Sequence, residues 1–154
     1  MADEPKLTHL AQDGSISMVD VSDKPVVGRE AVARGFITIT AETQSLIAAD
    51  GIKKGNVLAT ARIAGIQAAK QTALLIPLCH QLPLSHVAVD FEEKPDGIAI
   101  NTTARTKAQT GVEMEALTAA SIAALTIYDM CKAVDKTMAI SQITLLEKHK
   151  DSAS

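Results

Sequence analysis

Aromatic residues are almost absent from this chain of 154 residues, which contains one Tyr, two Phe and no Trp. Single-stranded nucleic acid is usually bound on aromatic side chains that stack with the bases, so the composition argues against such a surface. An excess of basic residues is also missing, since 15 Lys and Arg stand against 18 Asp and Glu for a net charge of −3. No global positive field can gather nucleic acid. We therefore expect no nucleic-acid partner, and any phosphate binding must be local.

Cysteine and long apolar runs are scarce as well. Cys79 and Cys131 are the two cysteines and form no CxxC pair, which argues against a disulfide framework or a zinc ribbon. No apolar stretch reaches the roughly 20 residues needed to cross a membrane. Asp3, Glu4 and Lys6 interrupt the start of the chain, where a signal peptide would be apolar. We expect a soluble, cytoplasmic protein with no membrane partner.

The longest helix pattern covers residues 110–134, and the rest of the chain is organised around it. Thr110 and Glu113 have the spacing of a capping box, so the pattern predicts that the helix begins there. Apolar residues recur at helical spacing and predict a core-facing stripe. The stripe consists of Leu117, Ala120, Ala124, Ile127, Cys131 and Val134, widened by Ile122 and Leu125.

Charged residues stand only at the two ends of this helix. Glu113 and Glu115 lie at the start, and Asp129 and Lys132 lie at the finish. Glu115 and Asp129 are 14 residues apart, which is about 21 Å at the rise of an α-helix. One site could use both ends if two copies of the helix lay antiparallel across a two-fold interface. The alternative is an ordinary i, i+3 ion pair between Asp129 and Lys132, with Glu113 as a cap only.

The other elements predict a small α+β domain. A strand is expected over 31–40, a short helix capped by Thr40 and closed by a left-handed Gly51, and a longer helix capped by Asn56 and ended by Pro77. The apolar stripe of that longer helix is Leu58, Ile63, Ile66, Ala69 and Leu74. Alternation around 87–92 and 98–106, with the turn at 95–97, predicts a hairpin. A brief extended segment is expected over 18–21, and a last strand over 138–146 with a bulge near Ser141 or Gln142.

This order is the β-α-β-β-α-β pattern of a ferredoxin-like fold, with a four-stranded antiparallel sheet and helices packed on one face. We expect a flexible N-terminal arm over 1–17, a single catalytic domain over 18–148 and a short tail over 149–154. The fold alone does not decide the function, because it serves enzymes, ligand-binding modules and RNA-binding domains.

Several residues outside the long helix could carry chemistry. Lys54 precedes a helix start, where an anion can bind, although a solvated turn is the simpler interpretation. Lys70 lies on that helix. His80 follows a proline corner and is, by itself, more often a structural histidine than a catalytic one. Lysines, a histidine and carboxylates without metal-ligand spacing suit proton transfer on an anionic substrate, so we expect no protein metal site.

Three long segments of the chain carry a specific resemblance. They read KKGNVLATARIAGIQAAKQT, LIPLCHQLPLS and TGVEMEALTAASIAALTIYDMCKAVDK. These segments closely resemble the signature segments of the molybdenum cofactor biosynthesis protein C family, the cyclic pyranopterin monophosphate synthases. The likeness runs from about Met18 to Lys148.

The resemblance implies a lyase of ferredoxin-like fold that assembles as a homohexamer, a trimer of dimers with sites at the dimer interface. Its substrate would be a cyclic dihydroguanosine triphosphate made from GTP by an upstream radical cyclase, which is the functional partner. The product would be cyclic pyranopterin monophosphate, with release of pyrophosphate. No cofactor is firmly implied, and Mg²⁺ is the one metal that a triphosphate suggests.

The resemblance also implies which residues act. Asp129 matches the family's active-site aspartate, and Lys132 and Lys54 match essential lysines. The substrate-contacting residues implied are Leu78, Cys79, His80, Met114 and Glu115, with Glu113, Lys70, Arg29, Asp20 and Lys148 as further pocket residues. The residues alone also allow a plain surface role for Asp20.

Our hypothesis makes Lys54 and Lys132 the proton-transfer pair, with Asp129 positioning Lys132. Lys70, Arg29 and Lys148 would balance the charge of the leaving pyrophosphate. Leu78 and Met114 would form apolar walls, and Glu113 or Glu115 would bind the donor edge of the guanine. The rival interpretations are a non-catalytic nucleotide-binding module of the same fold and a structural oligomer.

Overall fold

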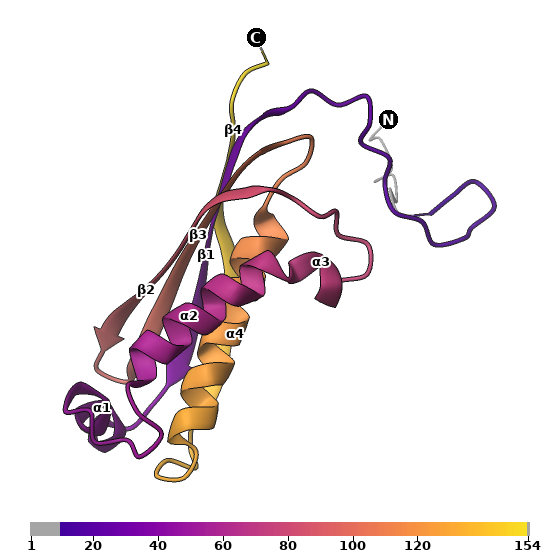
Figure 1. The fold of residues 1–154 in the computed structure, drawn as a ribbon. Helices are drawn as coiled ribbons and strands as arrows, with labels where there is room; N and C mark the ends of the chain where they lie inside the picture. The colour runs from indigo at the N-terminus through magenta and orange to yellow at the C-terminus, as the bar shows by residue number, and fades with distance from the viewer. Residues whose placement is uncertain (1–9, 154) are drawn as a thin grey trace, which may run out of the picture.

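A computed structural model describes residues 10–153 of the chain (Figure 1). The elements are, in order, β1 (Val27–Thr38), α1 (Ala41–Ala48), α2 (Val57–Lys70), α3 (Thr72–Leu75), β2 (Leu84–Lys94), β3 (Gly97–Ala108), α4 (Glu113–Cys131) and β4 (Ala139–Lys150). All neighbouring strands are antiparallel and their order in the sheet is β2-β3-β1-β4. The predicted four-stranded α+β fold of ferredoxin-like connectivity is thereby confirmed.

Helices α2 and α4 lie side by side over one face of the sheet (Figure 1). The alternation predicted for β1 holds, because Ala31, Ala33 and Ile37 have no exposed area and face the helices. The opposite face of the sheet carries charged side chains, including an ion pair of 3.5 Å between Arg34 and Glu92. The hydrophobic core is therefore the single layer between the sheet and the helix pair.

Small residues bring α2 and α4 together. A methyl group added at Gly65 of α2 would lie 3.0 Å from the carbonyl oxygen of Ala119 on α4. Ala119 and Ala123 are themselves fully buried. The two helix backbones approach so closely that a larger side chain at Gly65 would have to displace a neighbour.

This close approach corrects both predicted helix stripes. Ile63 on α2 is 63% exposed and Leu74 on α3 is 78% exposed. Leu125 on α4 is 53% exposed, and Val134, just after α4, is 56% exposed. The residues buried on α2 and α4 are mainly small: Val57, Ala61, Gly65, Ala68 and Ala69, and Glu115, Ala116, Ala119, Ala120, Ala123, Ala124, Ile127, Met130 and Cys131. These four larger apolar side chains, Ile63, Leu74, Leu125 and Val134, are left on the outer surface, where a partner could cover them.

Two helix starts form as predicted. The Thr43 amide donates to Thr40 Oγ1 at 3.2 Å, and the Ala59 amide donates to Asn56 Oδ1 at 2.8 Å. The Thr40 cap fixes the start of α1, and the Asn56 cap fixes the point where the loop between α1 and α2 enters α2. The end of α1 differs, because Asp50, with φ of 51°, takes the left-handed conformation that was expected of Gly51. Helix α2 also ends earlier than expected, at Lys70, so Pro77 does not terminate it.

The capping box predicted for α4 is wrong. The helix begins at Glu113 after Val112, and no side chain caps it. The Glu113 carboxylate instead lies 3.6 Å from the Lys148 amine on β4. That ion pair engages the carboxylate, which lies against Gly111, and Thr110 lines a cavity. The helix ends at Cys131, before the expected Val134.

At the two ends of the described chain, the structure confirms one prediction and corrects others. The bulge expected in the last strand is confirmed, because Gln142 has a φ of 55° and the β1–β4 register shifts between Arg34 and Phe36. Strand β4 continues through Lys150, beyond the predicted end at 146. The segment 18–21 forms no strand. Of the predicted arm, residues 1–9 lie outside the described residues, and 10–17 form a turn closed by a Leu10–Ile16 bridge.

Candidate active site

Two lysines converge on one carboxylate at the end of α4. Lys54 Nζ donates to Asp129 Oδ2 at 2.9 Å and also to the Asp129 backbone carbonyl at 2.9 Å. Lys132 Nζ lies 3.2 Å from Asp129 Oδ1. The i, i+3 pair expected on α4 is therefore present. The third member, Lys54, comes from the loop before α2 and could not be placed by spacing.

The lysines change the chemistry of this carboxylate. Hydrogen bonds from Lys54 and Lys132, with their positive charges, lower the pKa of Asp129 below its usual range. The carboxylate thus stays ionised at neutral pH and orients both amines. All three side chains are partly exposed to solvent, so a substrate could reach them. The cluster presents two proton donors side by side to an anion.

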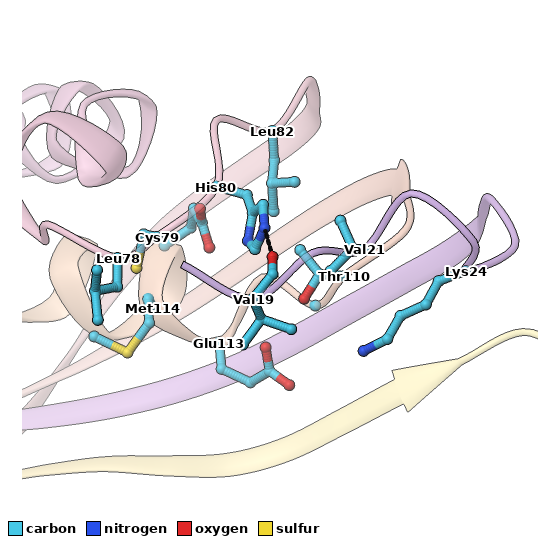
Figure 2. A pocket seen from close by; sticks show the side chains of 12 residues that line it. Val19, Val21, Lys24, Leu78, Cys79, His80, Leu82, Thr110, Glu113 and Met114 are labelled. Atoms are coloured by element: carbon cyan, nitrogen blue, oxygen red, sulfur yellow. Dashed lines mark hydrogen bonds between the residues drawn. The ribbon is translucent and has the colours of Figure 1, made fainter. Parts of the chain in front are cut away.

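A cavity of about 290 Å³ lies at the other end of the same helix (Figure 2). It gathers six of the residues expected to contact substrate: Leu78, Cys79, His80, Glu113, Met114 and Glu115. The first three come from the loop before β2, and the others form the first turn of α4. Val19, Val21 and Lys24 close a further side. Apolar and acidic groups thus surround a space suited to a polar ring.

The imidazole of His80 is held by the segment that precedes β1. Its Nε2 lies 2.6 Å from the backbone carbonyl of Val19 (Figure 2). A carbonyl oxygen only accepts, so Nε2 carries the proton in this bond. In the neutral ring, Nδ1 then keeps a lone pair and can accept a proton. The bond leaves one ring nitrogen for acid–base work.

Glu115 is the buried acid of this cavity. Its side chain is 4% exposed. Burial, together with the nearby Glu113 carboxylate, raises the pKa of Glu115 to about 7. Burial and the charge of Glu115 also raise the pKa of the Cys79 thiol. At neutral pH Glu115 can therefore donate or accept a proton, whereas Cys79 stays a neutral thiol.

Four other candidates lie outside this cavity. Arg29 and Lys148 line a second cavity of about 170 Å³, which shares Gly111 and Glu113 with the first. Lys70 lines a third cavity of about 270 Å³ with Ile66 and His86. Asp20 is exposed, and its Oδ1 accepts from the Ser22 amide at 2.9 Å. That hydrogen bond and the one from the Ser22 hydroxyl lower the pKa of Asp20.

The two main groups of residues stand at opposite ends of α4, about 21 Å apart along the helix axis. The sequence pattern placed the groups at these ends correctly. It missed residues that complete the cavity, namely Val19, Val21, Lys24, Leu82, Thr110 and Gly111. These residues lie in segments without helix or strand, where the sequence has no periodic pattern that would indicate which residues face a site.

A ferredoxin-like domain with a lysine–aspartate–lysine cluster and a buried acid beside a histidine defines an acid–base enzyme. The sequence pattern of the MoaC family matches residues 18–151, and the chain belongs to the MoaC family. The resemblance seen in the sequence is thereby confirmed.

The relatives are similar over almost the whole chain. The chain is 61% identical over 145 residues to a protein of Chloroflexus aurantiacus named cyclic pyranopterin monophosphate synthase, covering 93% of this chain and 89% of that protein. A protein of the same name from Chloroflexus aggregans is 59% identical over 145 residues, covering 93% of this chain and 88% of that protein. A molybdenum cofactor biosynthesis bifunctional protein of Chlorobaculum tepidum is 58% identical over 143 residues, 93% of this chain and 46% of that protein.

Proposed function

We propose that this chain is a lyase that converts a cyclic dihydroguanosine triphosphate into cyclic pyranopterin monophosphate with release of pyrophosphate. The relatives that are about 60% identical carry the name of this activity. The observation that carries the proposal is the meeting of Lys54, Asp129 and Lys132, because a binding module needs anion contacts but no paired proton donors. The upstream reaction would be a radical cyclisation of GTP, in the cytoplasm.

We infer that the complete site combines the two ends of α4 from two copies of the chain. One copy would supply the cavity with His80 and Glu115, and the other would supply the lysine–aspartate–lysine cluster. Large exposed apolar side chains support a partner copy on the helix face: Ile63, Leu74, Leu75, Leu125, Tyr128 and Val134. An antiparallel two-fold pairing places each helix start near its partner's helix end. A homohexamer of three such dimers is part of this proposal.

The acid–base groups would act on the purine-derived rings. Opening the five-membered ring and closing a new one requires protons to move to and from nitrogen and oxygen. Lys54 and Lys132 would deliver and remove these protons while Asp129 holds both amines in place. Glu115, whose pKa is raised to about 7, would exchange a proton with the donor edge of the ring. Leu78 and Met114 would contact the ring faces.

The phosphate step would use separate groups. A ribose hydroxyl loses its proton as its oxygen attacks the α-phosphorus. The new P–O bond closes the cyclic phosphate, the P–O bond to pyrophosphate breaks, and the pyrophosphate carries the proton away. Arg29 and Lys148 would balance the charge that builds on the leaving group, and Lys70 would act from a neighbouring copy. Any Mg²⁺ would arrive bound to the phosphates, which are its usual ligands in enzymes together with one or two carboxylates.

Incubation of the purified protein with the cyclic dihydroguanosine triphosphate tests the proposal. A lyase will yield a pterin, detected by the fluorescence of its oxidised derivative, and one pyrophosphate for each pterin. A binding module would return the nucleotide unchanged after equilibrium binding. A structural oligomer would not bind it.

A further inference from the structure

The segment 18–24 forms a wall of the cavity that holds His80 and Glu115, and four hydrogen bonds fix it. His80 Nε2 lies 2.6 Å from the carbonyl of Val19, and the Lys24 amide donates to the Val21 carbonyl at 3.0 Å. The Ser22 amide and hydroxyl donate to Asp20 Oδ1 at 2.9 and 2.5 Å. Lys24 therefore stands on a turn of defined geometry, and Pro25 follows it.

The Lys24 side chain is directed along the edge of this cavity. Figure 2 shows its amine pointing from the turn toward the side where Glu113 lies. No carboxylate of residues 10–153 lies within 4.0 Å of that amine, so it forms no ion pair with them. Glu113, an acidic residue of the same cavity, is paired with Lys148 at 3.6 Å. A cationic donor thus borders the cavity with no anion bound to it among these residues.

Other cations continue this border into the adjoining cavity. Arg29, Lys148 and Lys150 line the second cavity, which meets the first at Gly111 and Glu113. The Arg29 guanidinium is fixed by bonds to the carbonyls of Ala108 and Gln109, at 3.1 and 2.9 Å. Positive groups from the 18–24 turn, β1 and β4 therefore line the joined cavities, together with the carboxylates of Glu30 and Glu113. Such a set of cations suits a chain of phosphates.

We propose that Lys24 binds the phosphate chain of the substrate and the pyrophosphate that leaves it. This inference rests on the proposed function and adds a residue that neither the sequence patterns nor the family resemblance indicated. The ring of the substrate occupies the cavity beside His80 and Glu115. Its triphosphate extends past Glu113 toward Arg29 and Lys148, with Lys24 at the junction.

Kinetics of the Lys24→Gln variant test the assignment. The change removes one charge-assisted hydrogen bond, so KM is expected to rise about tenfold while kcat changes about twofold at most. The inhibition constant of pyrophosphate should rise by a similar factor. Lys24→Arg keeps the charge and should restore most of the affinity. Lys94→Gln, at the β2–β3 turn, changes the net charge equally at a distant place and should leave both constants unchanged.

Calorimetry with pyrophosphate separates this inference from the proposed function. If the unaltered protein forms no pterin, the proposed function fails, yet a weaker pyrophosphate affinity in Lys24→Gln still supports the role of Lys24. If the protein forms pterin and Lys24→Gln matches it in KM and in pyrophosphate affinity, the role of Lys24 is overturned. Circular dichroism will show that the exposed substitution leaves the fold intact.

Discussion

Lys54 and Asp129 are 75 residues apart in the sequence, and the lysine amine bonds to the aspartate twice. It donates to the side-chain oxygen Oδ2 and to the backbone carbonyl, both at 2.9 Å. This double contact joins the loop between α1 and α2 to the last turn of α4. Asp129 thereby positions two amines, since Lys132 reaches its other oxygen at 3.2 Å.

Removal of either amine should nearly abolish turnover. We expect Lys54→Ala and Lys132→Ala each to lower kcat by about a hundredfold or more, because each removes a positioned proton-transfer group. Single-turnover measurements of pterin formation check this. Lys53→Ala, a change at the exposed neighbouring residue, is the matched control and should retain activity. Near-normal turnover in both site variants would contradict the assigned roles.

Glu115 should make the folded state sensitive to pH. Its pKa is raised from 4.5 to about 7 in the folded chain, so the folded state keeps a proton that the unfolded state loses above pH 4.5. The stability should therefore fall as the pH rises from 4.5 to 7, by up to about 3 kcal/mol. Urea unfolding at pH 5 and pH 8 measures this slope. Glu115→Gln should flatten it, and an unchanged slope in that variant would be the contrary outcome.

Asp135 should stabilise the turn that follows α4. Burial opposes its ionisation, yet hydrogen bonds from the amides of Thr137 and Thr40 and from the hydroxyls of Thr137 and Thr43 lower its pKa to about 2. Its stabilising contribution is present above pH 3.8 and is lost as the pH falls toward 2. We expect Asp135→Asn to cost about 1 to 2 kcal/mol at pH 7. Acid unfolding followed by circular dichroism should show this difference shrinking below pH 4.

The small residues between α2 and α4 should tolerate no enlargement. Gly65→Val would force a side chain toward the Ala119 carbonyl oxygen, from which even an added Cβ would lie only 3.0 Å away. A loss of about 1 to 3 kcal/mol in unfolding free energy is expected. Gln67→Val places the same side chain on the exposed side of α2 and serves as control. Equal thermal midpoints for the two variants would show that the helices can move apart.

Local rules predicted the elements but not the faces of the helices. Thr40 and Asn56 were assigned as caps because a cap depends on residues three positions away. The stripes were right in part: Ala69, Ala120, Ala124, Ile127 and Cys131 are buried as predicted. They were wrong for Ile63, Leu74, Leu125 and Val134, which stay exposed because α2 and α4 pack through Gly65 and Ala119. Hydropathy alone does not distinguish a helix–helix contact made by small residues from a solvent-facing surface.

At the candidate site too, contacts between residues far apart in the sequence could not be predicted from local patterns. The predicted capping role of Glu113 failed because Lys148, on a strand 35 residues later, pairs with the glutamate. Spacing suggested Asp129 with Lys132, whereas only the family resemblance brought Lys54 to that pair. Lys24 was missed because its turn has no periodicity, and only the folded chain places it in the cavity that Glu115 also lines.

Mixing two inactive variants tests the shared site most directly. His80→Ala disables the cavity at the start of α4, and Lys132→Ala disables the cluster at its end. If each site takes one end from each copy, random re-pairing gives mixed dimers with one intact site, and about a quarter of the original activity returns. Activity in the re-paired mixture no higher than in either variant alone would show that the two ends of α4 do not meet across copies.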